Sequence, residues 1–168
     1  SYKLGADPNR VVTFHSLSKR SNLPGLRSGF AASGEKNIKQ MKQLRAYSGA
    51  PISEPLQHVS ASVWDDEDHV IQNREIYKKK YKFADKIFDD FDGYLSPEAG
   101  FFLWLDVDNG EKTALELWQT CGVRVLPGKY LAKDFNGQSP GDRFIRVAMV
   151  SELEETKDGL KKIREFLN

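Results

Sequence analysis

The chain has 168 residues, of which 39% are hydrophobic and 29% charged, and 25 Lys and Arg against 24 Asp and Glu leave a net charge of +1. This composition is typical of a globular protein with one ordinary domain or two small ones. It excludes a membrane span, because there is no run of about 18 apolar residues. It favours no nucleic-acid or lipid surface, because no basic block stands out.

The cysteine content limits the chemistry further. The single cysteine, Cys121, excludes an intrachain disulfide and a multi-thiolate zinc site, so we expect no metal. Because it follows an apolar stretch, we expect a buried structural thiol rather than a nucleophile. Residues 1–10 lack the basic-then-apolar pattern of a secretory signal. We therefore expect a reducing, cytoplasmic location.

The first third of the chain predicts two short strands and two helices. β-branched and aromatic residues predict a strand over residues 11–14, and a polar loop is expected over 16–25. A second strand is expected over 27–33. Apolar residues spaced by three predict a helix over 35–47, and Ser53 is a good N-cap for a further helix that reaches residue 64.

The middle of the chain predicts one long helix. Between Val70 and Phe91, apolar residues recur at spacings of three, four or seven, which indicates about six turns with one apolar stripe. We expect the lysines of this segment on its solvated face: Lys78, Lys79, Lys80 and Lys82.

The last part alternates strands and helices. Strands are expected over 101–107, 123–126 and 144–150, and helices over 113–120 and 153–167. Interleaved elements predict an α/β fold with an α+β small domain. Two strands at the start cannot form a stable sheet alone, so we expect the chain to be part of a larger molecule.

One polar segment, residues 16–29, combines an amine, hydroxyls and a guanidinium. Lys19 directly follows a predicted strand, Ser16 and Ser18 flank it, and Arg27 lies eight residues on. A neutral lysine amine attacks aldehydes, and hydroxyls with a guanidinium suit a phosphate. The segment could therefore hold both ends of a phosphorylated aldehyde. The alternative is a polar surface loop with a solvated lysine.

A second candidate is an arginine inside an apolar strand. Arg146 lies in the run Phe-Ile-Arg-Val-Ala, and a buried arginine is unfavourable unless an anion pairs with it. The anion is either an internal carboxylate or a bound ligand. Arg143, just before, is expected to be a solvated residue at the rim.

The segment SLSKRSNLPGLRSGF resembles the cofactor-lysine segment of fold-type I pyridoxal-phosphate aminotransferases of class I/II. The family pattern is Ser-x-Ser-Lys, then Asn/Gly-Leu-Pro-Gly-x-Arg, then Gly with Phe or Tyr. The resemblance implies that Lys19 holds pyridoxal 5′-phosphate as a Schiff base and moves a proton at the substrate α-carbon. It also implies that Ser16, Ser18 and Arg27 hold the phosphate. Arg146 would bind the substrate α-carboxylate.

The resemblance continues to the last helix. Residues 96–104 are similar to the family's Pro-x-Gly-aromatic-aromatic turn and strand, and residues 122–131 to its Gly-Val-x-Val-x-Pro-Gly segment. The particular form of the second motif is similar to succinyldiaminopimelate aminotransferases of lysine biosynthesis. Lys129 and Arg124 would then meet a distal carboxylate, with exposed surface side chains as the alternative.

The resemblance implies the C-terminal part of the pyridoxal-phosphate transferase fold. Residues 1–66 would be the end of the large mixed-sheet domain, 67–91 an interdomain helix and 92–168 the small domain. The family's upstream phosphate loop, ring-stacking aromatic residue and ring-nitrogen aspartate match nothing here, so we expect the chain alone to be inactive.

The implied function is transfer of an amino group between an amino acid, with glutamate expected as donor, and a 2-oxo acid. The full-length form is expected to be a homodimer. Two alternatives stay open: another fold-type I enzyme, of the aspartate or aromatic type or catalysing a different reaction, and a non-catalytic ligand-sensing module.

Overall fold

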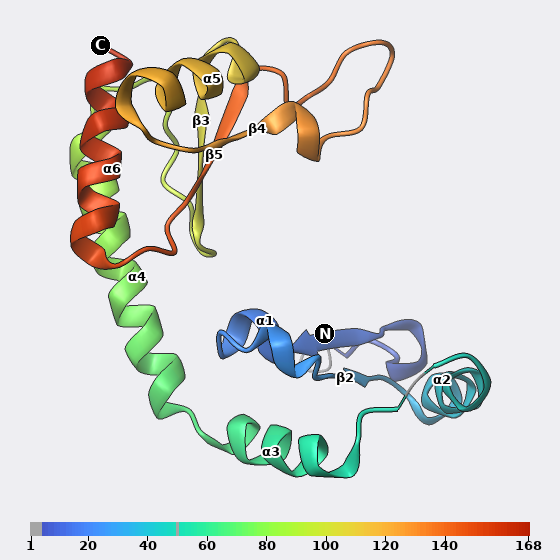
Figure 1. Ribbon diagram of the computed structural model, residues 1–168. Helices are drawn as coiled ribbons and strands as arrows, with labels where there is room; N and C mark the ends of the chain where they lie inside the picture. Colours follow the sequence, from blue (N-terminus) through green and yellow to red (C-terminus); the bar gives the residue numbers. More distant parts are fainter. Residues whose placement is uncertain (1–4, 50) are drawn as a thin grey trace. The chain divides into compact units, whose positions relative to one another are not determined.

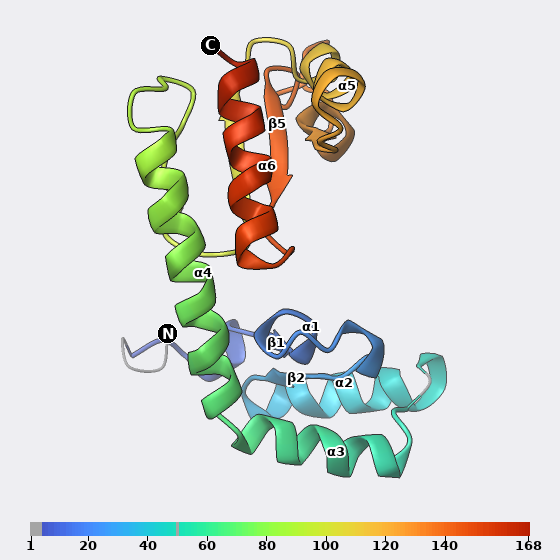
Figure 2. The same cartoon turned by 60° about the vertical axis from the view of Figure 1, so that its left-hand side comes forward.

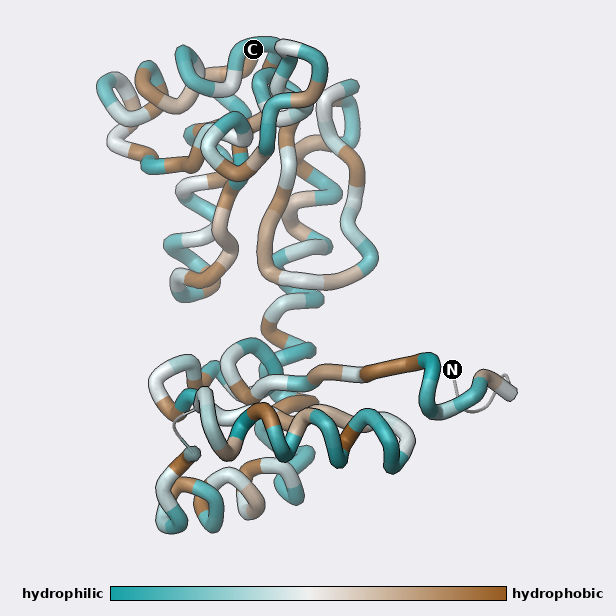
Figure 3. The backbone as a smooth tube through the Cα atoms, turned by 90° about the vertical axis from the view of Figure 1, so that its right-hand side faces the viewer, coloured by the Kyte–Doolittle hydropathy of each residue, from teal (hydrophilic) through white to brown (hydrophobic). Residues whose placement is uncertain are grey.

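The computed structural model describes residues 5–49 and 51–168. The chain divides into two compact units, Ser1–Gln72 and Asn73–Asn168. Hydrophobic and hydrophilic residues alternate along the helices of both (Figure 3). Within the described residues, no helix has the length and apolar character that crossing a membrane requires.

The first unit is built on a two-stranded antiparallel sheet. Strand β1 (Thr13–Ser16) pairs with β2 (Gly29–Ala32), in a register that runs from Thr13 opposite Ala32 to Ser16 opposite Gly29. The other elements of the unit are η2 (Pro8–Arg10), α1 (Leu17–Arg20), η3 (Pro24–Leu26), α2 (Glu35–Ser48) and α3 (Glu54–Asp65). Along the chain, α2 and α3 come after β2, as Figure 1 traces.

Two expectations for this unit need correction. The segment predicted as a loop over residues 16–25 contains the helical turn α1 and part of η3, because a side-chain cap at Ser16 and a buried Leu17 start a helix directly after β1. Ser53 occupies the N-cap position of α3 but its side chain accepts no capping hydrogen bond.

The first unit buries little apolar surface. Leu17 is fully buried, whereas Phe14, Leu44 and Tyr47 are largely exposed. A sheet of two strands has no second layer wide enough to cover both faces. The unit therefore presents apolar side chains that its own residues leave uncovered.

The second unit is a three-stranded antiparallel sheet with helices against it. The sheet has the order β3-β5-β4, so the last strand, β5, lies in the middle. Its elements are α4 (Asp68–Ile87, which begins in the first unit), β3 (Phe102–Asp106), α5 (Gly110–Cys121), β4 (Leu126–Pro127), η4 (Gly128–Leu131), β5 (Phe144–Ala148) and α6 (Leu153–Phe166). Figure 2 shows α6 and α5 on either side of β5 in that view.

The core of this unit lies on one face of the sheet. Alternate residues of β3 and β5 point into it, together with residues of α4, α5 and α6: Leu103, Leu105, Ile145, Val147, Ala84, Phe88, Leu117, Leu160 and Ile163. Because successive side chains of a strand point to opposite faces, the other face presents Phe102, Trp104, Phe144 and Arg146.

Lys80 does not lie on the solvated face of the long helix, as predicted. It is 4% exposed, and its Nζ donates to the carbonyls of Met149 at 2.8 Å and Ser151 at 2.5 Å. Lys80 is three residues from Tyr77 and four from Ala84, so it belongs to the apolar stripe. Its long aliphatic stem allows burial with the ammonium on backbone acceptors. Desolvation lowers the pKa of Lys80.

Other boundaries differ from the sequence-based expectation. The strand predicted over 123–126 pairs with β5 only at Leu126 and Pro127. The long helix ends at Ile87, four residues before Phe91. Cys121 is half-buried against the core rather than fully buried.

Candidate cofactor and substrate site

Lys19 lies on a single helical turn that β1 leads into directly. The Oγ of Ser16 caps this turn by accepting the N–H of Ser18 at 3.1 Å. The side chain of Leu17 is fully buried, and its carbonyl accepts the N–H of Ser21 at 3.1 Å, which closes the turn. The exposed Lys19 is therefore presented from a backbone fixed at both ends of the turn.

Arg20 fixes the same turn against α3. Its guanidinium donates to the carbonyls of Val63 at 3.0 Å and Trp64 at 3.2 Å, and it pairs with Glu67. It also lies 4.9 Å from the centre of the Trp64 ring. A cation at the C-terminal end of a helix satisfies carbonyls that lack helical partners. The sequence showed Arg20 only as a neighbouring cation, because its contacts with Val63, Trp64 and Glu67 are more than 40 residues away along the chain.

The hydroxyls predicted to bind phosphate lie beside Lys19. The Oγ atoms of Ser16 and Ser18 are 3.0 Å apart, and the Ser16 Oγ donates to the carbonyl of Ser28 at 3.3 Å. Since Ser16 pairs with Gly29 at the end of the sheet, α1 and the residues just before β2 meet at this end.

Arg27 comes from those residues before β2. Its backbone is left-handed, with φ of 51°, and Nη1 donates to the carbonyl of Pro24 at 2.9 Å. Its side chain is exposed, and among residues 5–49 and 51–168 no carboxylate forms an ion pair with it. Most of its five N–H donors therefore remain available to an anion.

These residues fit a phosphorylated aldehyde. The residues that carry an amine, two hydroxyls and a guanidinium stand at the end of β1 and just before β2, and these are the donor types that a phosphate ester with a reactive carbonyl requires. The structure places Ser16, Ser18 and Lys19 on one helical turn at the end of β1, and Arg27 two residues before β2, the strand that pairs with β1.

Arg146, in the second unit, lies in the middle strand of its sheet. It pairs with Trp104 of β3 and Leu126 of β4. Its guanidinium lies 4.1 Å from the centre of the Phe102 ring, and its buried Nε has no hydrogen-bond partner. An internal ion pair, one of the two alternatives, is not found for Arg146 among the residues that the structure describes.

Arg143, unlike Arg146, forms ion pairs among the described residues of this unit. Its Nε lies 3.0 Å from Asp106 Oδ2 and its Nη1 3.2 Å from Asp108 Oδ1, and its side chain is exposed, as expected for a residue at the rim. The hydrogen bond from Arg143 lowers the pKa of Asp106. The carboxylates of Asp106 and Asp108 therefore pair with Arg143 and not with Arg146.

The two side chains considered for a distal carboxylate are exposed and have partners. Lys129 Nζ lies 3.7 Å from Glu111 Oε2, and the Arg124 guanidinium lies 4.7 Å from the centre of the Trp118 ring. Their assignment to a substrate stays a prediction.

The family model for aminotransferase class I and II matches residues 2–163, so the chain belongs to this family. Members of the family use pyridoxal phosphate. The motif at Lys19 and the fit of the donor set agree with this result.

Solved structures show the same fold. An aminotransferase from Neisseria meningitidis Z2491 is 36% identical, with a TM-score of 0.93 over 99% of this chain and 43% of that one. The aminotransferase AspB from Helicobacter pylori 26695 is 34% identical, with a TM-score of 0.87 over 98% and 42%. The predicted fold class, a C-terminal part of the pyridoxal-phosphate transferase fold, is confirmed.

Among curated proteins, an LL-diaminopimelate aminotransferase of Dehalococcoides mccartyi is 25% identical over 160 residues. The match covers 92% of this chain and 40% of that protein. The chain spans about 40% of the length of the curated relatives it matches.

Proposed function

We propose that this chain provides the cofactor-attaching lysine and the substrate-binding arginine of an aminotransferase. The reaction moves an amino group between an amino acid, with glutamate as the expected donor, and a 2-oxo acid. The observation that supports this most directly is the arrangement of Ser16, Ser18, Lys19 and Arg27 at one end of the β1–β2 sheet in a chain of this family.

The residues of the proposed site divide the work between them. Lys19 Nζ would hold the cofactor at its aldehyde carbon and, as a free amine, would move a proton at the substrate α-carbon. Ser16, Ser18 and Arg27 hold the phosphate by hydrogen bonds that a dianion strengthens. Pyridoxal phosphate, when bound, supplies the electron sink for the α-carbon. Arg146 binds the substrate carboxylate through its planar, bidentate fork.

The larger organisation is part of the proposal. Residues 1–66 belong to the large domain, 67–91 form the interdomain helix and 92–168 the small domain. The whole protein is a homodimer in the cytoplasm. A diaminopimelate or its succinyl derivative is the proposed substrate, which the similarity to LL-diaminopimelate aminotransferases supports.

Trapping the cofactor tests the attachment site. The chain is incubated with pyridoxal phosphate, reduced with borohydride, digested, and the modified peptide is mapped. We expect the label on Lys19, because Lys19 and Ser18 lie on the helical turn that Ser16 caps, and both serines are proposed to hold the phosphate. Lys19→Arg keeps the charge and should abolish specific labelling.

Lys36→Arg, at an exposed position of α2, is the matched control and should label as the unaltered chain does. A label distributed over surface lysines, or one that persists in Lys19→Arg, would contradict the proposal.

A further inference from the structure

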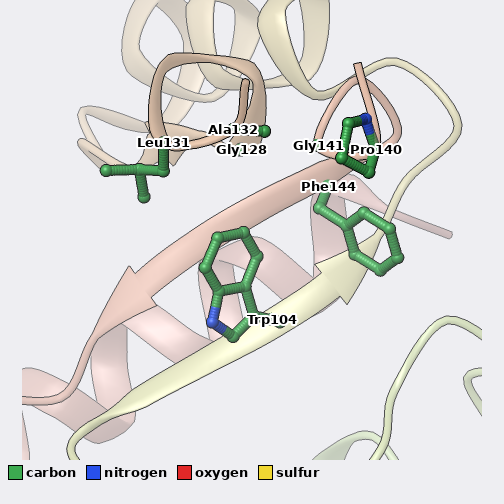
Figure 4. Close-up of a pocket in the computed structure, with 7 residues that line it drawn as sticks. All are labelled: Trp104, Gly128, Leu131, Ala132, Pro140, Gly141 and Phe144. Carbon is green, nitrogen blue, oxygen red and sulfur yellow. The ribbon is translucent and has the colours of Figure 1, made fainter. Parts of the chain in front are cut away.

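The second unit contains a pocket of about 350 Å³ that offers no charged group. Figure 4 shows the Trp104 indole and the Phe144 ring on two adjacent strands, with Leu131 and Pro140 on the loops beside them. Small-molecule sites fix the orientation of a ligand through a few placed polar groups. Such groups are instead concentrated in the first unit, around Arg20.

Arg20, the residue after Lys19, is bonded to the end of α3. Its Nη1 donates to the carbonyl of Val63 at 3.0 Å, and its Nη2 donates to those of Trp64 at 3.2 Å and Asp66 at 3.3 Å. The last carbonyls of a helix lack backbone partners, and a basic side chain satisfies them. The Arg20 side chain is 14% exposed, so these bonds are largely shielded from water. One guanidinium thus joins α1 to the carbonyl end of α3.

The turn that carries Lys19 depends on such contacts because it is short. Helix α1 has four residues, and a helix of fewer than about 12 residues is marginal in water without packing. Ser16 caps its start, and at its end the N–H of Ser21 donates to the Leu17 carbonyl at 3.1 Å. Arg20 also donates to the Oγ of Ser21 at 3.1 Å, and Ser21 is buried. The end of the turn, where Lys19 lies, is therefore held by Arg20.

The carbonyls contribute more to this contact than the ion pair with Glu67 does. The Glu67 side chain is 63% exposed, and an ion pair with an exposed carboxylate adds little to stability. Hydrogen bonds from a charged guanidinium are strong where water is excluded. The planar fork of arginine reaches several acceptors at once, whereas a lysine offers a single point charge. The position of the Lys19 turn thus depends on the shape of Arg20 and not on its charge alone.

We propose that Arg20 is a positioning residue for Lys19. By bonding to the end of α3, it holds α1 in the position from which the Lys19 amine reaches the aldehyde of the cofactor. The inference rests on the proposed attachment of the cofactor at Lys19, and it adds a residue that acts through the backbone of α1.

Hydrogen exchange in the absence of cofactor measures the hold on the turn. Arg20→Met keeps an unbranched side chain without a donor, and we expect the Ser21 N–H to exchange about tenfold faster in this variant. The Ile38 N–H, which donates to the Gly34 carbonyl at 3.1 Å in the same unit, is the reference and should change much less. The two amides would respond equally if Arg20 only stabilised the unit as a whole.

Borohydride trapping measures the effect on the cofactor. The rate of labelling at Lys19 is followed against the concentration of pyridoxal phosphate, which separates the limiting rate from the half-saturating concentration. We expect Arg20→Met to lower the limiting rate about tenfold, because the opened turn presents the amine for less of the time. The half-saturating concentration should change less, because Ser16 and Arg27, proposed to hold the phosphate, lie outside α1.

Three further variants separate shape, charge and general stability. Arg20→Lys keeps the charge and should restore neither readout. Glu67→Gln removes the exposed partner and should behave nearly like the unaltered chain. Arg164→Met is the matched control, because Arg164 is 15% exposed, pairs with Asp90 and lies 5.8 Å from the centre of the Phe91 ring. This change in the second unit should alter neither readout.

Unchanged labelling in Arg20→Met, an equal increase of exchange at Ser21 and Ile38, or restoration by Arg20→Lys would each overturn the inference. A defect in Glu67→Gln as large as that in Arg20→Met would overturn it as well. If the unaltered chain carries no label at Lys19, the proposed function fails, and Arg20 has no cofactor-binding lysine to position. The unaltered chain therefore tells the two failures apart.

Discussion

Basic side chains that are close together in the sequence have different environments in this protein. Arg143 is bound by two carboxylates, whereas Arg146, three residues later, contacts an aromatic ring and has an unsatisfied Nε. Lys79 is exposed, whereas Lys80 is buried against two carbonyls. At this scale, function and stability depend on partners that lie far along the chain.

Lys80 provides the prediction at the residue scale. Lys80→Met keeps the aliphatic stem but removes the Lys80 donor to the Met149 carbonyl and one of the two side-chain donors to the Ser151 carbonyl, which still accepts from Thr156 Oγ1. We expect a loss of about 1–3 kcal/mol in the free energy of unfolding, since the buried Met149 carbonyl loses the Lys80 donor. Urea unfolding of the chain, followed by circular dichroism, measures the loss.

Lys79→Met is the matched control for this change, because it alters the neighbouring exposed lysine. Equal stabilities of the two variants would show that the buried ammonium contributes nothing net.

At the scale of the elements, the helices differ in whether a side chain caps their N-terminus. The Asn109 side chain accepts the N–H of Lys112 at 3.0 Å and caps α5, whereas the Ser53 side chain makes no such bond at the start of α3. Ser53 was predicted as an N-cap from its residue type, but the backbone geometry before the helix decides whether the side chain reaches an N–H.

Asn109→Ala and Ser53→Ala form a pair that tests this difference. We expect Asn109→Ala to cost about 1 kcal/mol, the usual value of an N-cap hydrogen bond. Ser53→Ala should change the unfolding free energy much less. Thermal or urea unfolding of both variants checks it, and a larger effect of Ser53→Ala would refute the assignment of the caps.

At the scale of the whole molecule, the first unit has too little structure to bury its own apolar surface. Its sheet has two strands, and Phe14, Leu44 and Tyr47 are largely exposed. The chain also spans about 40% of its curated relatives.

We therefore expect little or no amino transfer by the 168-residue chain, even when Lys19 is labelled by the cofactor. The measurement is conversion of glutamate and a 2-oxo acid acceptor by a preparation whose loading has first been confirmed by borohydride trapping. Sustained turnover by that preparation would show that the chain needs no further residues for catalysis.

The amino-acid sequence alone determined the family, the α/β fold class and most helices and strands. The reason is local: helical periodicity, strand composition and the SLSKRSNLPGLRSG motif are properties of neighbouring residues. The tertiary structure decided which polar side chains are satisfied. The burial of Lys80, the anchoring of α1 by Arg20, the open donors of Arg146 and the shortness of β4 all depend on atoms from distant segments. Such contacts form only when the elements pack, so the sequence did not identify their partners, although the spacing of Lys80 from Tyr77 and Ala84 already placed Lys80 on the apolar stripe of its helix.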